Sequence, residues 1–109
     1  MVYENRALFE MMLIRGEPQV REEIFQRLVK RDYESALDVY RYIHEGRNPT
    51  QAVCDTLLEA TKLSFRGMIN IFARYPCFEE AVDELALFQQ FFSSGFLFLL
   101  RQKPEQEGV

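Results

Sequence analysis

Residues 78–101 read FEEAVDELALFQQFFSSGFLFLLR, and this stretch decides how the chain is expected to fold. Apolar side chains recur along it at spacings of three and four residues, which predicts an amphipathic helix. The members of this stripe are Phe78, Val82, Leu85, Phe88, Phe92, Phe96 and Leu99. The segment therefore predicts a last helix that packs one face into a core.

A second set of apolar side chains lies off that stripe. It consists of Leu87, Phe91, Phe98 and Leu100. A helix that is apolar all round has to be buried all round. Two alternatives follow: the last helix is the central helix of the domain, or its extra face contacts another chain. Monomers rarely expose a patch that holds two or three Phe rings.

The preceding segment carries the clearest local signal for the start of a helix. Asn48 is expected to cap it, Pro49 to take the first helical position, and Gln51 to return a hydrogen bond as in a capping box. The helix is expected to end before Pro76, because a proline pushes the residue before it out of the helical region. Gly67 costs about 1 kcal/mol relative to Ala inside a helix, which does not forbid continuity. One helix, bent near Gly67, is favoured over two.

Three further helices are expected towards the N-terminus. They cover residues 4–14, residues 18–30, and a segment from a cap at Asp32 to a stop at Gly46. The sequence thus predicts an all-α fold: a single small bundle of five antiparallel helices with short loops, or six if residues 49–74 are divided. The helical domain is expected to span residues 1–101, and residues 102–109 to form a disordered polar tail.

One segment resembles a known kind of helical repeat. Residues 28–63 carry Ala36-Leu37-Asp38-Val39-Tyr40, followed by Gly46, Pro49 and Leu57-Leu58-Glu59-Ala60. This pattern resembles part of a pentatricopeptide or tetratricopeptide helical hairpin, and it covers about a third of the chain. It does not recur after Pro76, whereas such arrays need three or more repeats. The resemblance therefore implies helix-turn-helix packing and not membership of either family.

The charge of the chain gives weak support to nucleic-acid binding. The 109 residues include 13 basic and 17 acidic side chains, for a net charge of −4, so no strongly basic field is expected. The alternative function we consider is a helical-hairpin module that binds nucleic acid through a set of basic residues. That set is Arg21, Arg27, Lys30 and Arg31, and the acids Glu22, Glu23, Glu34 and Asp38 lie among them.

The residues that carry most enzyme chemistry are scarce. The single histidine, His44, and two cysteines, Cys54 and Cys77, are too few for a structural zinc site, and no nucleophile motif surrounds them. The glycines are isolated, so no phosphate-binding loop is present. The densest carboxylates, Glu79 to Glu84, suit the first turns of a solvated helix. We expect no enzyme, metal, cofactor or small-molecule substrate; an enzyme would have to rely on carboxylates and tyrosines.

Cysteine use and hydropathy predict a cytoplasmic, intracellular protein without a membrane segment. Two cysteines are fewer than a disulfide framework in a small secreted domain would usually carry. Glu4, Arg6 and Glu10 interrupt any apolar run that resembles a signal peptide. No stretch reaches the roughly 18 consecutive apolar residues of a membrane span.

These observations together predict a non-enzymatic protein–protein interaction domain, of an adaptor or regulatory kind, that uses an apolar helical surface. The expected partner is another protein, and foremost a second copy of the chain in a homodimer. Phe91, Phe98 and Leu87 are the predicted anchors. Met11 and Met12 are predicted to form a second, adaptable surface.

Overall fold

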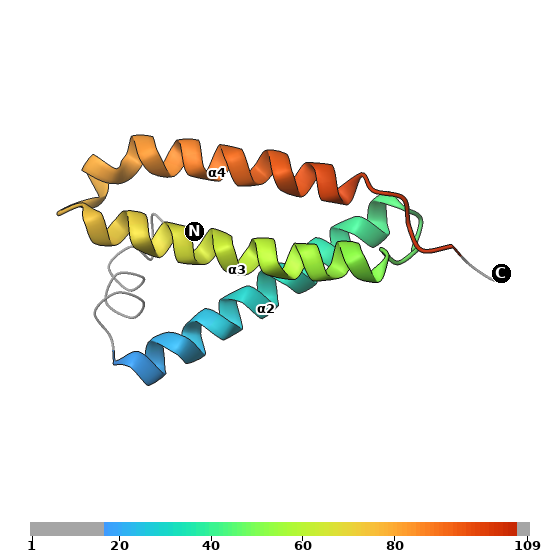
Figure 1. Ribbon diagram of the computed structural model, residues 1–109, viewed down its shortest axis with the longest axis horizontal. Helices are drawn as coiled ribbons and strands as arrows, with labels where there is room; N and C mark the ends of the chain where they lie inside the picture. Colours follow the sequence, from blue (N-terminus) through green and yellow to red (C-terminus); the bar gives the residue numbers. More distant parts are fainter. Residues whose placement is uncertain (1–16, 107–109) are drawn as a thin grey trace.

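The computed structural model describes residues 17–106, which form three helices joined by short turns. They are α2 (Pro18–Ile43), α3 (Gln51–Arg74) and α4 (Phe78–Leu100). Figure 1 shows α3 and α4 side by side and antiparallel, while α2 crosses α3 obliquely and diverges from it towards its own N-terminal end. The result is elongated, with extents of 54 × 30 × 21 Å.

The all-helical character is confirmed for residues 17–106, but the predicted bundle of five or six helices is wrong, because this part of the chain has three. The first predicted helix, over residues 4–14, lies outside the described residues. The two helices expected over 18–30 and 32–46 are one continuous helix, α2. Asp32 favours a cap, yet no proline or glycine near it removes a backbone donor or requires a positive φ, so the helix continues through it.

The start of α3 also differs from the prediction. The capping residue is Thr50 and not Asn48, and its Oγ1 accepts a hydrogen bond from the Val53 N–H at 3.3 Å. Asn48 instead accepts a bond from Arg41 Nε at 2.8 Å. Pro49 is buried before the helix, where it forms an isolated bridge with Pro104. Threonine is itself a good cap, so the helix begins two residues later without losing its first hydrogen bond.

α3 runs unbroken through Gly67, so residues 51–74 are one helix. The glycine has a packing reason, because a Cβ on Gly67 would overlap the Phe88 ring on α4. The absence of a side chain lets the ring settle against the helix surface. Gly67 is thus a place where a side chain of α4 packs directly against the backbone of α3.

The core is divided between the two faces of α3. One cluster joins α3 to α4 through Met68, Ile71, Ala81 and Leu85. The other joins α2 to α3 and is built on Phe25 and Val29, with Leu58, Phe65 and Ile69 packed around them. Within residues 17–106 the central helix is therefore α3. The alternative in which the last helix is central is wrong for this part of the chain.

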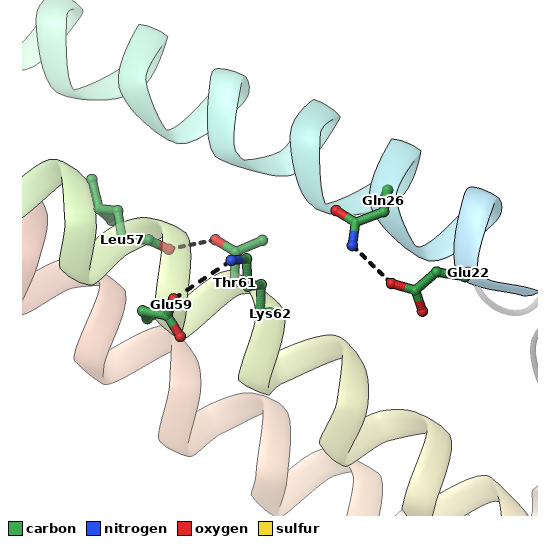
Figure 2. Close-up of polar contacts among 6 residues, drawn as sticks. All are labelled: Glu22, Gln26, Leu57, Glu59, Thr61 and Lys62. Atoms are coloured by element: carbon green, nitrogen blue, oxygen red, sulfur yellow. Dashed lines mark hydrogen bonds and ion pairs between the residues drawn. The ribbon is translucent and has the colours of Figure 1, made fainter.

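Polar groups on α3 are satisfied locally. Thr61, the buried polar residue of the described core, donates its hydroxyl to the Leu57 carbonyl at 2.7 Å (Figure 2). Figure 2 also shows surface contacts of one-turn spacing, in which Gln26 donates to Glu22 at 2.8 Å and Lys62 lies 3.5 Å from Glu59. A bond to the carbonyl one turn earlier lets a hydroxyl enter the core without an unmet donor.

The end of α4 is fastened to the turn between α2 and α3. The fully buried Tyr40 donates its hydroxyl to the Gln102 carbonyl at 2.7 Å, and His44 Nε2 lies 2.7 Å from the Leu100 carbonyl. The Glu105 N–H donates to the Asn48 carbonyl at 2.8 Å. Residues 102–106, expected from the sequence to be a disordered tail, include two of these partners, Gln102 and Glu105; residues 107–109 lie outside the described part.

The close approach at Gly67 predicts opposite effects of alanine at two helical glycines. Gly67→Ala should lower the thermal midpoint, because overpacking costs about 1–3 kcal/mol and outweighs the gain of about 1 kcal/mol in helix propensity. Gly95→Ala is the matched control, since no atom lies within 4 Å of its added Cβ, and it should raise the midpoint. Circular dichroism melts give both values. Equal stabilisation by the two alanines would contradict the packing described.

Candidate protein-interaction surface

One face of α4 is committed to α3. Ala81 and Leu85 are buried there, and Phe88 covers Gly67. At the turn between the helices, Arg74 Nη2 donates to Glu84 Oε1 at 2.7 Å. These contacts fix the rotation of α4 about its own axis, and they therefore decide which side chains point away from the domain.

The contact between Arg74 and Glu84 also has an electrostatic signature. The hydrogen bond from Arg74, followed by one from Tyr75, lowers the pKa of the Glu84 carboxyl below its ordinary value. The same pairing raises the pKa of the Tyr75 phenol, chiefly through its hydrogen bond to Glu84. Both shifts favour the ionised carboxylate beside a cation and a phenolic donor, which ties the first turns of α4 to the end of α3.

The opposite face of α4 carries large apolar side chains in solvent. Leu87 is 69% exposed, Phe91 72% and Phe98 64%. Spacings of four and seven residues keep these positions within about 40° of arc on a helix of 3.6 residues per turn. Ser94 falls on the same line, three residues after Phe91. We call Leu87, Phe91, Ser94 and Phe98 the outer face of α4.

The Phe91 ring is oriented by its neighbours. It meets Phe92 edge-on, with ring centroids 5.4 Å apart. Phe92 is in turn packed against Phe88 at 4.8 Å and lies 6.4 Å from Phe96. The edge contact with Phe92 limits the orientations of the Phe91 ring on that side, while most of the ring faces solvent.

Ser94 is the polar residue within the outer face, and two charged residues lie just beyond its ends. Ser94 donates its hydroxyl to the Gln90 carbonyl at 3.1 Å, which leaves a small and internally satisfied side chain between the two Phe rings. Asp83 and Arg101 are exposed near the two ends of the face, and neither forms an ion pair with another residue of the described range. An acidic end and a basic end thus flank an apolar centre.

The structure places the predicted anchors Leu87, Phe91 and Phe98 together on one surface. Leu100, which also lies off the inward stripe, turns towards α2 and α3 and lines a cavity of about 250 Å³. Sequence reasoning missed the contribution of Ser94 and the charged ends, although their spacing from Phe91 already placed them on the same side. Met11 and Met12 lie outside the described residues.

The basic residues of the alternative function are divided between two sides of α2. Arg27, Lys30 and Arg31 are exposed on the side away from α3, where helical spacing also places Glu23, Glu34 and Asp38. Arg21 lies on another side, at a cavity of about 420 Å³ between α2 and α3. Alternating charges along one face weaken the local potential that phosphate binding depends on.

Other chemistry-bearing groups are dispersed. Cys54 and Cys77 are free and half-buried, and they lie near opposite ends of α3, roughly 30 Å apart by helix rise. Within residues 17–106, no three side chains among His, Cys, Asp and Glu are grouped as metal ligands. In the same range, no helix has the length and apolar content needed to cross a membrane.

Arg66 and Phe25 both line the cavity between α2 and α3. The Arg66 guanidinium forms a cation–π contact with the Phe25 ring, 4.5 Å from the ring centroid. Glu22, on the opposite wall, accepts the bond from Gln26. The described residues that line this cavity include no histidine, cysteine or hydroxyl side chain.

In comparisons with known proteins, no family model, no curated protein and no solved structure matches this chain. The resemblance of residues 28–63 to a helical-hairpin repeat thus describes how α2 and α3 are joined.

The lowered pKa of Glu84 predicts a pH-dependent contribution to stability. A carboxyl whose folded pKa lies below its unfolded value stabilises the fold above the unfolded value, and that stabilisation is lost as the pH falls through the folded pKa. The thermal midpoint of Glu84→Gln should therefore lie below that of the natural chain near neutral pH, and the two should converge in strong acid. Glu80→Gln, which removes a nearby exposed charge, is the control. A gap for Glu84→Gln that is independent of pH would refute the assignment.

Proposed function

We propose that this chain is a non-enzymatic protein-interaction domain, of an adaptor or regulatory kind, that binds through the outer face of α4. The observation that carries the proposal is the exposure of Leu87, Phe91 and Phe98 on a helix whose opposite face is already buried. Together these side chains expose on the order of 400 Å² of apolar surface, taking about 200 Å² for a whole aromatic side chain. Patches of a few hundred Å² on small proteins are often functional.

The anchors have the properties of binding hot spots. Aromatic side chains contribute strongly to association when they lie at the centre of a contact, and Phe91 lies near the centre of the outer face. The ring of Phe92 meets Phe91 edge-on and supports one side of it. The side chains of Tyr40 and His44 form hydrogen bonds within the fold, to the carbonyls of Gln102 and Leu100.

We further propose that the partner is foremost another copy of the chain, and that the compartment is the cytoplasm. Free thiols at Cys54 and Cys77 are compatible with a reducing environment. A homodimer is the commonest symmetric assembly, and it needs only one surface that complements itself.

The test is the mass in solution, measured by light scattering from low to high micromolar concentration. The natural chain should rise from one towards two chains as the concentration increases. Phe91→Glu should remain a single chain with unchanged helicity by circular dichroism, because a buried unpaired carboxylate opposes association. Tyr42→Glu is the matched control, since Tyr42 is an exposed aromatic residue on α2, 89% accessible, and its replacement should leave association intact.

Two outcomes would count against the proposal. One is a natural chain that has the mass of one molecule at every concentration. The other is an equal loss of association in Phe91→Glu and Tyr42→Glu, which would show that association does not depend on the outer face. Loss of helicity in Phe91→Glu would show instead that Phe91 belongs to the core.

A further inference from the structure

We propose that two copies of the chain pair through the outer face of α4 with their α4 helices antiparallel, about a two-fold axis that passes between Phe92 and Ser93. This inference rests on the proposed function and adds to it the partner's orientation and register. Large, small and charged side chains follow one another along one line of the helix in an order that favours this pairing.

The apolar side chains are self-complementary about that point. In a two-fold interface the contacts are reciprocal. If one residue of the first copy contacts a second residue of the other copy, then that second residue in the first copy contacts the first residue in the other. The midpoint of Leu87 and Phe98 falls between Phe92 and Ser93. In an antiparallel pair centred there, Leu87 comes level with Phe98 of the second copy, so an exposed aliphatic group meets an exposed ring at both ends.

The same register brings a large side chain level with a small one. Phe91 comes level with Ser94 of the second copy, and the reverse contact follows by symmetry. The Ser94 hydroxyl is already bonded to the Gln90 carbonyl at 3.1 Å, so covering it leaves no donor unmet. Because large groups meet small ones, the two helix axes can approach to about 8–10 Å, which is the usual distance between packed helices.

Charge selects the antiparallel direction. Asp83 and Arg101 lie on the same flank of α4, because they are separated by 18 residues, or five turns of 3.6. In this antiparallel register Asp83 lies within one residue, or about 1.5 Å of helix rise, of the level of Arg101 of the second copy at both ends of the contact. Parallel pairing would set each charge against its own kind. The helix dipoles also oppose each other favourably when the helices are antiparallel.

The size of the contact predicts a concentration-dependent dimer. If each chain contributes on the order of 400 Å² of apolar surface, the pair buries roughly 800 Å² plus the flanking polar atoms. This total lies below the range of stable, specific interfaces, which begins at about 1,200 Å², and falls among weak and transient contacts. The steepest change in mass should therefore occur in the micromolar range.

The first arm of the test is a charge exchange, with the dimer dissociation constant measured by sedimentation. Asp83→Arg and Arg101→Asp should each weaken association by roughly three- to tenfold, because each sets like charges opposite one another. The double variant restores opposite charges across the axis and should return the constant to the natural value. Two single variants that weaken association without rescue in the double variant would overturn the antiparallel register.

The second arm is cross-linking in a chain whose two cysteines are replaced by serine, with retained helicity and mass as controls. A mixture of Asp83→Cys and Arg101→Cys chains should form a disulfide-linked dimer on mild copper-catalysed air oxidation. Neither chain should cross-link with itself, because like positions lie more than about 25 Å apart along antiparallel helices. Self-cross-linking of each variant would establish parallel pairing and overturn the inference, while the proposed function would stand. A natural chain that stays monomeric would overturn both.

Discussion

The packing of Phe88 against Gly67 is the contact on which the rest of the surface depends. It seats an α4 ring directly on the backbone of α3, and it sets the rotation of α4 about its axis. The Arg74–Glu84 pair, near the turn between α3 and α4, holds α4 in the same register. With α4 rotated in this way, Ala81 and Leu85 face inward, and Leu87, Phe91 and Phe98 have no position left except the outside.

The position of α3 explains why these side chains stay exposed. α3 lies between the other two described helices and uses separate clusters to hold them, through Met68 and Ile71 on one side and Phe65 and Ile69 on the other. α2 is directed away from α4 along much of its length, as Figure 1 shows, so it cannot cover the outer face. An apolar surface of this kind favours contact with another chain. Our proposal of an interaction domain follows from that preference.

Much of this arrangement could be predicted from the sequence, where periodicity was strong. The inward and outward stripes of α4 were both predictable, because spacings of three and four residues place side chains on one face whatever the tertiary fold. The number of helices was not. Asp32 has a high preference for caps, but a preference is worth about 1 kcal/mol and does not interrupt a helix that keeps burying side chains such as Phe25, Val29 and Tyr40.

The remaining features depend on contacts between distant segments, which local patterns do not encode. The shift of the α3 cap to Thr50 accompanies the contact of Pro49 with Pro104. The hydrogen bond from the Tyr40 hydroxyl to the Gln102 carbonyl joins residues 62 positions apart. From the sequence, Gly67 was expected only to weaken the helix. Its packing role depends on the Phe88 ring of α4, which occupies the space that a Cβ would need.

The most direct measurement is a dilution series of backbone amide NMR spectra. The account predicts concentration-dependent shifts that are confined to the outer face, from Leu87 to Phe98, while the amides of Phe25 and Val29 on α2 stay unchanged. Spectra that do not change on dilution, or shifts that centre on α2, would contradict the claim that α4 presents the binding surface of this molecule.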